Sequence, residues 1–542
     1  MAGPMKFDDK SIAGKELSVE ERTELLVIGG GSAGLSAAIQ AARQGLAVVL
    51  VDENPVPFAT MGAEVPHHYG QGMSGVARNR NAMLEAMIAS EPLIEAAFEA
   101  GVDVRLGTAC WGLYGKSDST RWMPGTVAGL ADEERGWLIG ADHVIVAAGR
   151  RDMGLGFPGW DRPGVMGATA AMSLARVGAL APRRVVLLGT SAEALVAAEE
   201  LMKAGVEIAA IVEQAAEPVG PAAMLAAVRA SGCEVLAGHV VREATGPETV
   251  EAATVCAVDK AGQAVGDERS IPCDGIVLAV GVTPVIDLVA ALGAGVTFQP
   301  DRGGYAPVVD ADQRTTVRNV FVIGDGAGIW PAKSCDRSIA EREGRRAVAA
   351  VLADRGMAGD EATPESVVPA KPAYDIAAYR LDWVRASVVE AREAFHVCQC
   401  EEVTAREILE VRPPRYLDWQ VERRNDRSLS SLLGDGPPNP DQVKRLTRAG
   451  MGACQGRRCR EQVAALLALQ SATPLASIPL AGYRAPVRPL SLAVASSLPE
   501  AEDQAAHWDV WFGIHAQWRP YWEIPEFYTV ATNDATTPAA SE

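Results

Sequence analysis

The stretch that decides the fold is ELLVIGGGSAGLSAAIQAARQGLAVVLVDENP, residues 24–55. An apolar run over 25–28 predicts a strand, residues 32–44 have the spacing of a helix, and residues 47–51 predict a second strand. A strand, a glycine turn, a helix and a second strand together make a βαβ unit. The sequence therefore predicts an α/β protein with a doubly wound sheet.

The glycine turn has the spacing G-x-G-x-x-G, formed by Gly29, Gly31 and Gly34. The first glycine permits the tight turn, the second lets the backbone approach a pyrophosphate, and the third lets helix and strand pack closely. The phosphate would lie at the helix N-terminus, beside Ser32 and Ala33. The alternative is that these glycines serve packing only, but the strand before them and the helix after them favour a dinucleotide site.

Acidic residues at strand ends extend this prediction. Asp52 follows Gly34 by 18 residues, at the end of the second strand, where a carboxylate can bind ribose hydroxyls, and Glu53 is the neighbouring candidate. Asp325, in VFVIGDGAG, can reach a ribityl hydroxyl, although a helix-capping role is the alternative. The apolar strand in ADHVIVAAGR also ends in a glycine. The predicted FAD site comprises Gly29, Gly31, Ser32, Ala33, Gly34, Asp52, Glu53, Gly149, Gly324 and Asp325.

A second unit follows in RRVVLLGTSAEALVAAEELMKAGVEIAAIVEQ, residues 183–214, but its turn is degenerate. Only Gly189 of the fingerprint is present, because Ser191 and Ala194 stand where glycines belong. These side chains would crowd a pyrophosphate, and Glu193 would place a negative charge beside it. We interpret the unit as a nucleotide-domain scaffold that no longer binds NAD(P), with retained binding as the alternative.

Four of the nine cysteines form two tight pairs, Cys398-x-Cys400 and Cys454-x4-Cys459. Each iron of a [2Fe-2S] cluster needs two cysteine sulfurs, which two pairs supply. Four thiolates also suit a structural zinc site, but C-x-C is tighter than the usual zinc spacing. A third reading is that the cysteines are merely buried. The pattern favours [2Fe-2S] over zinc.

Composition sets limits on the function. The chain has 542 residues, of which 48% are hydrophobic and 22% are charged, as in a globular protein of about three folding units. Its net charge of -19 argues against nucleic acid as a partner. No signal-peptide pattern and no apolar run of about 18 residues is present. These features predict a cytoplasmic protein without a transmembrane segment.

The segments suggest a modular order. Near the C-terminus, four of the eleven tryptophans fall within 508–522. Such an aromatic segment either packs on its own domains or docks on a partner. The predicted order is an N-terminal extension (1–21), an FAD-binding domain split into 22–150 and 285–360, an inserted and degenerate NAD-type nucleotide domain (151–284), a linker (361–394), an iron–sulfur domain (395–470), and an extended aromatic segment with a disordered tail (471–542).

Several motifs resemble one known family over about residues 22–470. They are VIGGGSAGLSAA (27–38), FPGWDRPGVM (157–166), FVIGDGAG (321–328), CQCEEVT (398–404) and VKRLTRAGMGACQGRRC (443–459). The chain resembles the alpha, or A-type, subunit of heteromeric bacterial opine and amino-acid dehydrogenases, of the octopine and nopaline oxidase, hydrogen cyanide synthase and D-hydroxyproline dehydrogenase type. The last motif is similar to bacterioferritin-associated ferredoxin.

The resemblance implies a flavoprotein with two dinucleotide-binding domains, of the glutathione reductase type, followed by a small C-terminal [2Fe-2S] domain. It also implies a hetero-oligomer. In the family, a beta subunit resembling D-amino-acid oxidase carries its own FAD and oxidises the C–N bond, and a small third subunit is a further expected partner. Some relatives hold FMN between subunits, and some bind ATP or ADP where FAD would lie.

Three functions remain open at this point. The first is an electron-transfer subunit of an FAD and [2Fe-2S] dehydrogenase acting on an opine, amino acid or secondary amine, with substrate oxidised mainly on a partner. The second is a self-contained NAD(P)H-dependent reductase that passes electrons through FAD to the cluster. The third is a non-catalytic iron–sulfur module, which would not need Asp52 and Asp325. No catalytic residue is assigned from the sequence.

Overall fold

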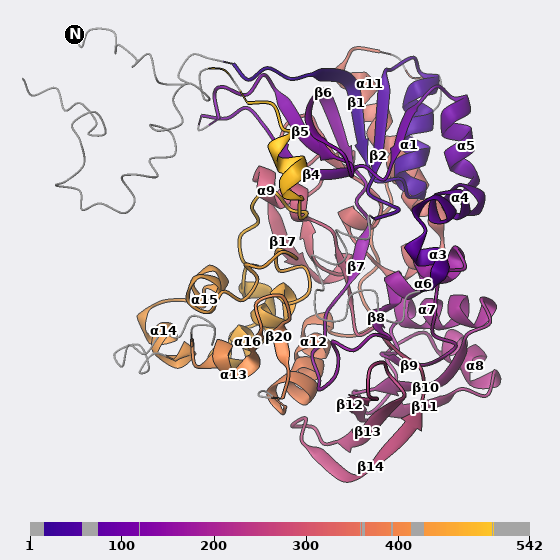
Figure 1. Ribbon diagram of the computed structural model, residues 1–542, viewed down its shortest axis with the longest axis vertical. Helices are drawn as coiled ribbons and strands as arrows, with labels where there is room; N and C mark the ends of the chain where they lie inside the picture. The colour runs from indigo at the N-terminus through magenta and orange to yellow at the C-terminus, as the bar shows by residue number, and fades with distance from the viewer. Residues whose placement is uncertain are drawn as a thin grey trace, which may run out of the picture.

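A computed structural model of the chain (Figure 1) describes residues 16–56, 74–118, 120–357, 359, 364–391, 394–412, 428–500 and 502. The aromatic cluster predicted over 508–528 lies outside these residues. Within the described residues, no helix is both long enough and apolar enough to cross a membrane.

The first unit forms a seven-stranded mixed sheet in the upper part of Figure 1. Its strand order is β3-β2-β1-β6-β5-β4, and β19 pairs with β6 beside this path. The first three strands, β6 and β19 run parallel, whereas β4 and β5 form an antiparallel edge. The strands are β1 (Glu21–Ile28), β2 (Val48–Asp52), β3 (Asp103–Leu106), β4 (Ala109–Tyr114), β5 (Thr126–Ala131), β6 (Gly136–Val146) and β19 (Val320–Val322).

Two helices from distant parts of the sequence pack together on this sheet. Gly344 of α11 is so close to α1 that a Cβ atom built on it would lie 2.6 Å from the carbonyl oxygen of Ala33. Leu25, Leu35 and Val348 share one buried core between the sheet and these helices. The helices of this part are α1 (Ser32–Arg43), α3 (Gly75–Arg78), α4 (Arg80–Ser90), α5 (Pro92–Glu99), α9 (Asp287–Leu292), α10 (Pro331–Cys335) and α11 (Arg337–Asp354).

The second unit forms a five-stranded parallel sheet in the order β11-β10-β9-β15-β8, in the lower part of Figure 1. A three-stranded antiparallel sheet, β12-β13-β14, lies below it. The elements are β8 (Val165–Gly167), α6 (Ala168–Arg176), β9 (Arg184–Leu188), α7 (Ala192–Lys203), β10 (Glu207–Glu213), α8 (Ala222–Ala230), β11 (Glu234–Ala237), β12 (His239–Thr245), β13 (Ala252–Val258), β14 (Ala264–Pro272) and β15 (Gly275–Leu278).

The chain enters and leaves the second unit through a short antiparallel ribbon. Strand β7 (Arg150–Asp152) pairs with β16 (Val282–Pro284), and β19 then returns to the first sheet beside β6. The second unit is therefore inserted between β6 and β19 of the first sheet. A hairpin of β17 (Val296–Gln299) and β18 (Gly304–Pro307), with a 3-10 turn at Pro300–Arg302, lies on the return path.

The stretch predicted as a linker, 361–394, is more structured than the sequence suggested. Its second half forms α12 (Ile376–Val384), which Asp375 caps by accepting hydrogen bonds from two backbone amides, and a π-helical turn at Arg385–Val389. The indole of Trp383 is fully buried. The proline-rich composition of 362–375 concealed this helix, because the helix begins only after the last of those prolines.

The cysteine module packs against the second unit and shares one hydrophobic core with it. It appears at the lower left of Figure 1. Its elements are β20 (His396–Cys398), β21 (Val403–Thr404), α13 (Ala405–Leu409), α14 (Leu429–Asp435), α15 (Pro440–Thr447), α16 (Arg460–Ser471) and a 3-10 turn at Leu475–Ser477. The chain then returns to the first sheet, where Val494 of α17 (Leu492–Ser496) packs on Trp111.

Candidate functional site

The glycine turn after β1 has the geometry that its spacing predicted. Gly29 has φ +115°, and a Cβ atom on it would lie 2.2 Å from the carbonyl oxygen of Ala147. A Cβ atom on Gly34 would lie 2.0 Å from the carbonyl oxygen of Gly29. Among the residues that the structure describes, none has an atom within 4 Å of a Cβ built on Gly31. Two glycines are thus required by packing, whereas the third faces open space.

The N-terminus of α1 lies beside that open space. Its N-cap is Gly31, a residue with no side chain that could accept hydrogen bonds from the first turn of the helix. Backbone amides at such a terminus bind phosphate, and the helix dipole favours the negative charge. Ser32 and Ala33 stand in this first turn. The turn therefore fits the pyrophosphate of a dinucleotide on two independent features, the open space at Gly31 and the uncapped helix.

The two acidic candidates at the end of β2 have different partners. Asp52 accepts a hydrogen bond of 2.6 Å from the Gly30 amide and one of 2.8 Å from the Asn54 amide. Burial raises the pKa of Asp52, and these amides oppose the rise. Glu53 forms an ion pair with Arg488, with 2.6 Å between Oε2 and Nε. Asp52 thus braces the glycine turn, while Glu53 binds the C-terminal segment.

The other predicted residues come together at the same turn. Gly324 and Asp325 begin a 3-10 turn, Gly324–Ala327, directly after β19. A Cβ atom on Gly324 would lie 3.0 Å from the Ala33 Cβ atom, and one on Gly326 would lie 3.8 Å from the Gly149 backbone. The structure therefore gathers residues from three distant segments beside the start of α1. Asp325 also lies 3.6 Å from Arg150, measured between Oδ2 and Nε.

A buried ion pair supports this turn, and sequence reasoning missed it. Lys333 and Glu343 lie 2.9 Å apart and have almost no exposed side-chain surface. Lys333 donates a 2.8 Å hydrogen bond to the Gly324 carbonyl, and Glu343 accepts one of 2.8 Å from the Gly324 amide. The Lys333 ammonium also lies 3.9 Å from the centre of the Trp330 ring. The pair clamps both backbone polar groups of the residue preceding Asp325.

In the second unit, the corresponding helix N-terminus is closed by its own side chain. Ser191 is the N-cap of α7, and its hydroxyl accepts a hydrogen bond from the Ala194 amide. Glu193 in the first turn accepts a 3.2 Å hydrogen bond from the hydroxyl of Ser334, which belongs to α10. A carboxylate and a hydroxyl therefore lie where the first unit has a bare helix terminus.

The acidic residue at the end of β10 is closed off as well. Glu213 has no exposed surface. It accepts a hydrogen bond of 2.5 Å from the Thr190 hydroxyl and one of 2.9 Å from the Tyr379 hydroxyl of α12. Burial raises the pKa of Glu213. The position that would bind ribose is therefore filled by two hydroxyls of the chain itself.

The four paired cysteines lie together, although Cys398 and Cys454 are 56 residues apart. The Sγ atoms of Cys398 and Cys400 are 4.0 Å apart, and those of Cys400 and Cys454 are 3.6 Å apart. Cys459 contacts Cys398. Two sulfurs bound at about 2.3 Å to one tetrahedral metal lie about 3.8 Å apart, so these separations suit shared metal ligation. Within the described ranges, however, no three His, Cys, Asp or Glu side chains converge on one metal-ion position.

Two glycines, Gly450 and Gly452, line the thiol cluster. The Gly450 amide donates a 3.4 Å hydrogen bond to the Cys398 sulfur. A Cβ atom on Gly452 would lie only 2.5 Å from the Cys400 sulfur. The hydrogen bond with Cys398 raises the pKa of Cys400 to about 12. Cys398, Cys454 and Cys459 are buried, whereas Cys400 is partly exposed.

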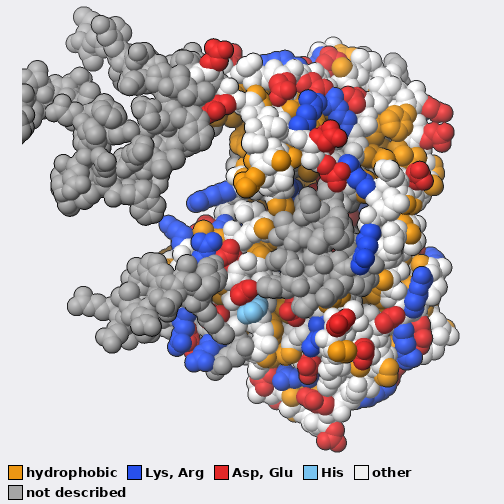
Figure 2. Space-filling model, viewed as in Figure 1, with side chains coloured by type: hydrophobic (Ala, Val, Ile, Leu, Met, Phe, Trp, Pro, Cys, Tyr) orange, Lys and Arg blue, Asp and Glu red, His pale blue; other side chains and the backbone are white. Residues whose placement is uncertain are grey.

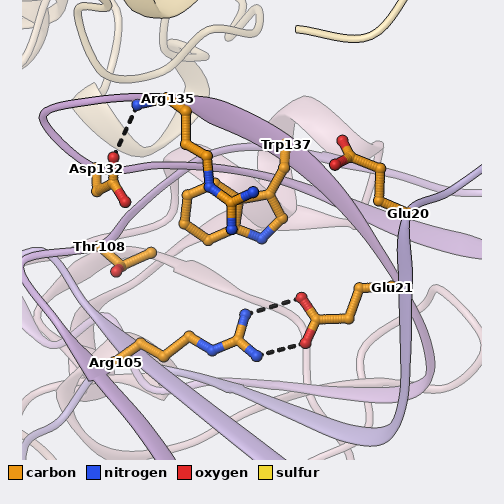
Figure 3. Close-up of a pocket in the computed structure, with 7 residues that line it drawn as sticks. All are labelled: Glu20, Glu21, Arg105, Thr108, Asp132, Arg135 and Trp137. Carbon is orange, nitrogen blue, oxygen red and sulfur yellow. Dashed lines mark hydrogen bonds and ion pairs between the residues drawn. The ribbon is translucent and has the colours of Figure 1, made fainter. Parts of the chain in front are cut away.

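A separate hollow of about 530 Å³ lies at the edge of the first sheet (Figure 3). Its walls carry the ion pair of Arg105 with Glu21, and the guanidinium of Arg135 lies over the Trp137 ring, 4.8 Å from its centre. Glu20, Thr108 and Asp132 complete the lining. None of these residues was predicted, and none belongs to the glycine turn or the thiol cluster.

Comparison with known proteins shows the class of protein to which the chain belongs. The sequence pattern of the family described as pyridine nucleotide-disulphide oxidoreductase matches residues 23–352. Because this match spans more than half of the chain, the chain belongs to the pyridine nucleotide-disulphide oxidoreductase family and is an oxidoreductase. The family implies FAD binding.

Individual relatives show which kinds of subunit the chain is similar to. The chain is 29% identical to the A subunit of the opine oxidase of Agrobacterium tumefaciens (strain Ach5), over 88% of this chain and 92% of that protein. It is 26% identical to the HcnB subunit of the hydrogen cyanide synthase of Pseudomonas aeruginosa, over 80% and 90% of the two chains. These similarities confirm the resemblance to A-type subunits. The L-proline dehydrogenase structure from P. horikoshii has the same fold, with a TM-score of 0.55 and 20% identity over 88% of this chain and 80% of that one.

Proposed function

We propose that the chain is the electron-transfer subunit of a heteromeric dehydrogenase that oxidises a C–N bond in an opine, amino acid or secondary amine. The observation that carries the proposal is the contrast between the two nucleotide units in one chain that also gathers four thiols. The first unit has an open, uncapped phosphate site, and the second has its site filled by its own side chains.

FAD is the ligand proposed for the first site. Gly31, Ser32 and Ala33 would hold its pyrophosphate, Asp52 its adenosine ribose, and Asp325 its ribityl chain, with Gly149 and Gly324 in backbone contact. A bound flavin would exchange one or two electrons with a neighbouring redox group. The residues of the chain bind and orient the flavin, and the Lys333–Glu343 pair fixes the Gly324 backbone. ATP or ADP could use the same phosphate and ribose contacts.

A [2Fe-2S] cluster is the group proposed for the four thiols. Contacts connect the sulfurs in the order Cys459, Cys398, Cys400, Cys454. A single zinc ion needs all its ligands around one point, whereas a two-iron cluster needs two pairs around two points. The C-x-C spacing of Cys398 and Cys400, which is tighter than the usual zinc spacing, favours the two-iron cluster. Such a cluster transfers one electron at a time.

The closed second unit argues against the alternative of a self-contained NAD(P)H reductase. A nicotinamide dinucleotide would need to displace the Tyr379 hydroxyl from Glu213 and the Ser191 hydroxyl from the helix terminus. It would also bring its phosphates to the Glu193 carboxylate. Substrate electrons therefore have to arrive by another route, and we propose that a flavin-bearing beta subunit supplies them. The names of the relatives, which are subunits, support a hetero-oligomer; FMN between subunits and a small third subunit belong to the same proposal.

The experiment is single-turnover reduction of the purified native complex under anaerobic conditions. An opine or amino-acid substrate is mixed with the complex, and flavin and cluster absorbance are followed separately. We expect substrate to bleach both in the complex and neither in the isolated chain, and NADH and NADPH to bleach neither. Rapid bleaching of the isolated chain by either nicotinamide nucleotide would instead identify a self-contained reductase.

A further inference from the structure

A loop that contacts two of the cluster sulfurs carries exposed side chains. Gly450 and Gly452, which contact the sulfurs of Cys398 and Cys400, flank Met451. The Met451 side chain is 39% exposed, and Ala453 beside it is also exposed. Among the described residues, Met451 is the one large apolar side chain of the cysteine module that reaches solvent to this extent. An exposed apolar side chain thus stands next in sequence to Gly452, which contacts the sulfur of Cys400, the partly exposed member of the cluster.

The net charge of the cysteine module differs in sign from that of the rest of the chain, although Arg460 of this module is buried 3.7 Å from Asp287. Residues 395–470 contain twelve Lys and Arg against ten Asp and Glu, a net charge of +2, so the remainder of the chain carries -21. The excess is concentrated in 444–460, which has six basic residues and no acidic one. On the face shown in Figure 2, Lys and Arg side chains, with some Asp and Glu side chains, appear beside the region where Figure 1 places α13 to α16.

Some of the basic side chains of 444–460 are held by hydrogen bonds or an ion pair, and some are exposed to solvent. Arg445 is exposed on α15 and donates to the Asp441 carbonyl. Arg448 pairs with Glu401 at 2.7 Å, and Arg458 donates a 2.9 Å hydrogen bond to Gln399, the residue between Cys398 and Cys400. Glu401 lies beside Gly452 of this loop, the exposed Glu402 follows it in the sequence, and Asp441 precedes Arg445 by one turn of α15, so the basic excess is modest in size.

We propose that the loop 450–453, with Met451 at its tip and a basic rim that includes Arg445, is the surface through which the cluster exchanges electrons with a redox protein whose docking face is acidic. This inference rests on the proposed function, because it requires the cluster. Interfaces of electron-transfer proteins are small, so one apolar tip with a charged rim suffices. Opposite charge at that point steers an acidic partner to it, while the strongly acidic remainder of the chain repels the partner elsewhere.

The test uses two soluble electron acceptors of opposite charge, an acidic cytochrome of the b5 type and a basic cytochrome c. The full chain is reduced with dithionite, freed of excess reductant and mixed with each cytochrome in a stopped-flow instrument. Rates that disappear in the Cys454→Ser variant are those that pass through the cluster. We expect the rate with the acidic cytochrome to fall about tenfold between about 20 mM and 300 mM salt, and that with the basic one not to fall.

Three variants locate the surface. Met451→Glu and Arg445→Glu should each lower the low-salt rate with the acidic cytochrome several-fold while the cluster's electron-paramagnetic signal is unchanged. Phe98→Glu is the matched control, because Phe98 is 52% exposed on α5 of the first unit, and it should leave the rate unchanged. Identical salt dependence for both cytochromes, or full rates in both loop variants, would overturn the docking surface alone. A chain that shows no cluster signal would overturn the proposed function, and this inference with it.

Discussion

The phenol of Tyr379 donates a 2.9 Å hydrogen bond to the carboxylate of Glu213, which ends β10 as Asp52 ends β2. Tyr379 belongs to α12, 166 residues further along the chain. A segment outside the second βαβ unit therefore supplies the partner that a ribose hydroxyl would supply in a nucleotide complex. This contact, with the Thr190 and Ser191 hydroxyls, is the physical reason for treating the second unit as a scaffold.

Removal of the Tyr379 hydroxyl should destabilise the chain without creating a nucleotide site. Tyr379→Phe leaves the buried Glu213 with one fewer donor, which costs about 1–3 kcal/mol of unfolding free energy. Thermal unfolding measures this loss, and calorimetric titration with NADH should show no binding in either protein. Tyr305→Phe is the matched control, because its buried hydroxyl donates a 2.7 Å hydrogen bond to the Ile478 carbonyl, away from Glu213. Micromolar NADH binding by the wild-type chain would contradict this interpretation.

The glycine turn offers a paired test of packing against ligand binding. Gly34→Ala should lower the unfolding temperature, because its Cβ atom would lie 2.0 Å from the Gly29 carbonyl oxygen. Gly31→Val should leave the unfolding temperature of the flavin-free chain almost unchanged, since the added atoms enter open space. The same substitution should weaken FAD binding at least tenfold by occupying the pyrophosphate position. Equal flavin affinity in Gly31→Val and wild type would remove FAD from this site.

The first unit could be predicted from the sequence because its signals are local. The strand over 25–28, the helix from Ser32 and the acid at Asp52 all lie within one unbroken pattern, and the structure has β1, α1 and β2 there. The separate partners of Asp52 and Glu53 could not be predicted, because the Arg488 side chain that binds Glu53 comes from more than 400 residues away. Ser191 and Ala194 led to the proposal that the second unit no longer binds a nucleotide, whereas the hydrogen bond of Tyr379 to Glu213 could not be predicted from the sequence.

The buried pair of Lys333 and Glu343 should behave as a unit. Lys333→Met leaves a buried carboxylate without its cation, which costs about 3–5 kcal/mol, and it should weaken FAD binding because Gly324 loses one of its two side-chain contacts. The double variant Lys333→Met with Glu343→Leu should recover part of the stability, since no unpaired charge remains. Thermal unfolding with and without FAD measures both effects. A double variant no more stable than Lys333→Met would contradict the pairing.

The pairing of Lys333 with Glu343 could not be predicted from the sequence. Ten residues separate Lys333 from Glu343, and neither stands in a recognised motif. The hydrophobic periodicity of α11 places Glu343 on the buried face of the helix, so the sequence can indicate a buried acidic residue. It does not indicate which residue pairs with that acid. The thiol cluster was more predictable because cysteine pairs are rare and chemically specific. Its contacts with Gly450 and Gly452 follow from the loop fold, which spacing alone does not define.

Asp152 provides a pH-dependent contribution to stability. Burial raises its pKa from 3.8 to about 6, against hydrogen bonds from the Thr169 amide and hydroxyl. The folded chain therefore binds this proton more tightly than the unfolded chain, so the contribution is most favourable below about pH 4 and declines as pH rises to about 6. Asp152→Asn cannot titrate, and its stability relative to wild type should rise across that window. Urea unfolding from pH 4 to 7 measures the difference, and a constant difference would contradict the raised pKa.

The proposed electron-transfer role requires the [2Fe-2S] cluster. The decisive measurement is electron paramagnetic resonance, combined with iron and zinc analysis, on the chain purified anaerobically and reduced with dithionite. We expect two irons per chain and a rhombic signal that integrates to one spin, with both lost in Cys454→Ser and both retained in Cys335→Ser, whose cysteine is exposed and apart from the cluster. One zinc ion per chain, with no iron and no signal, would contradict the account.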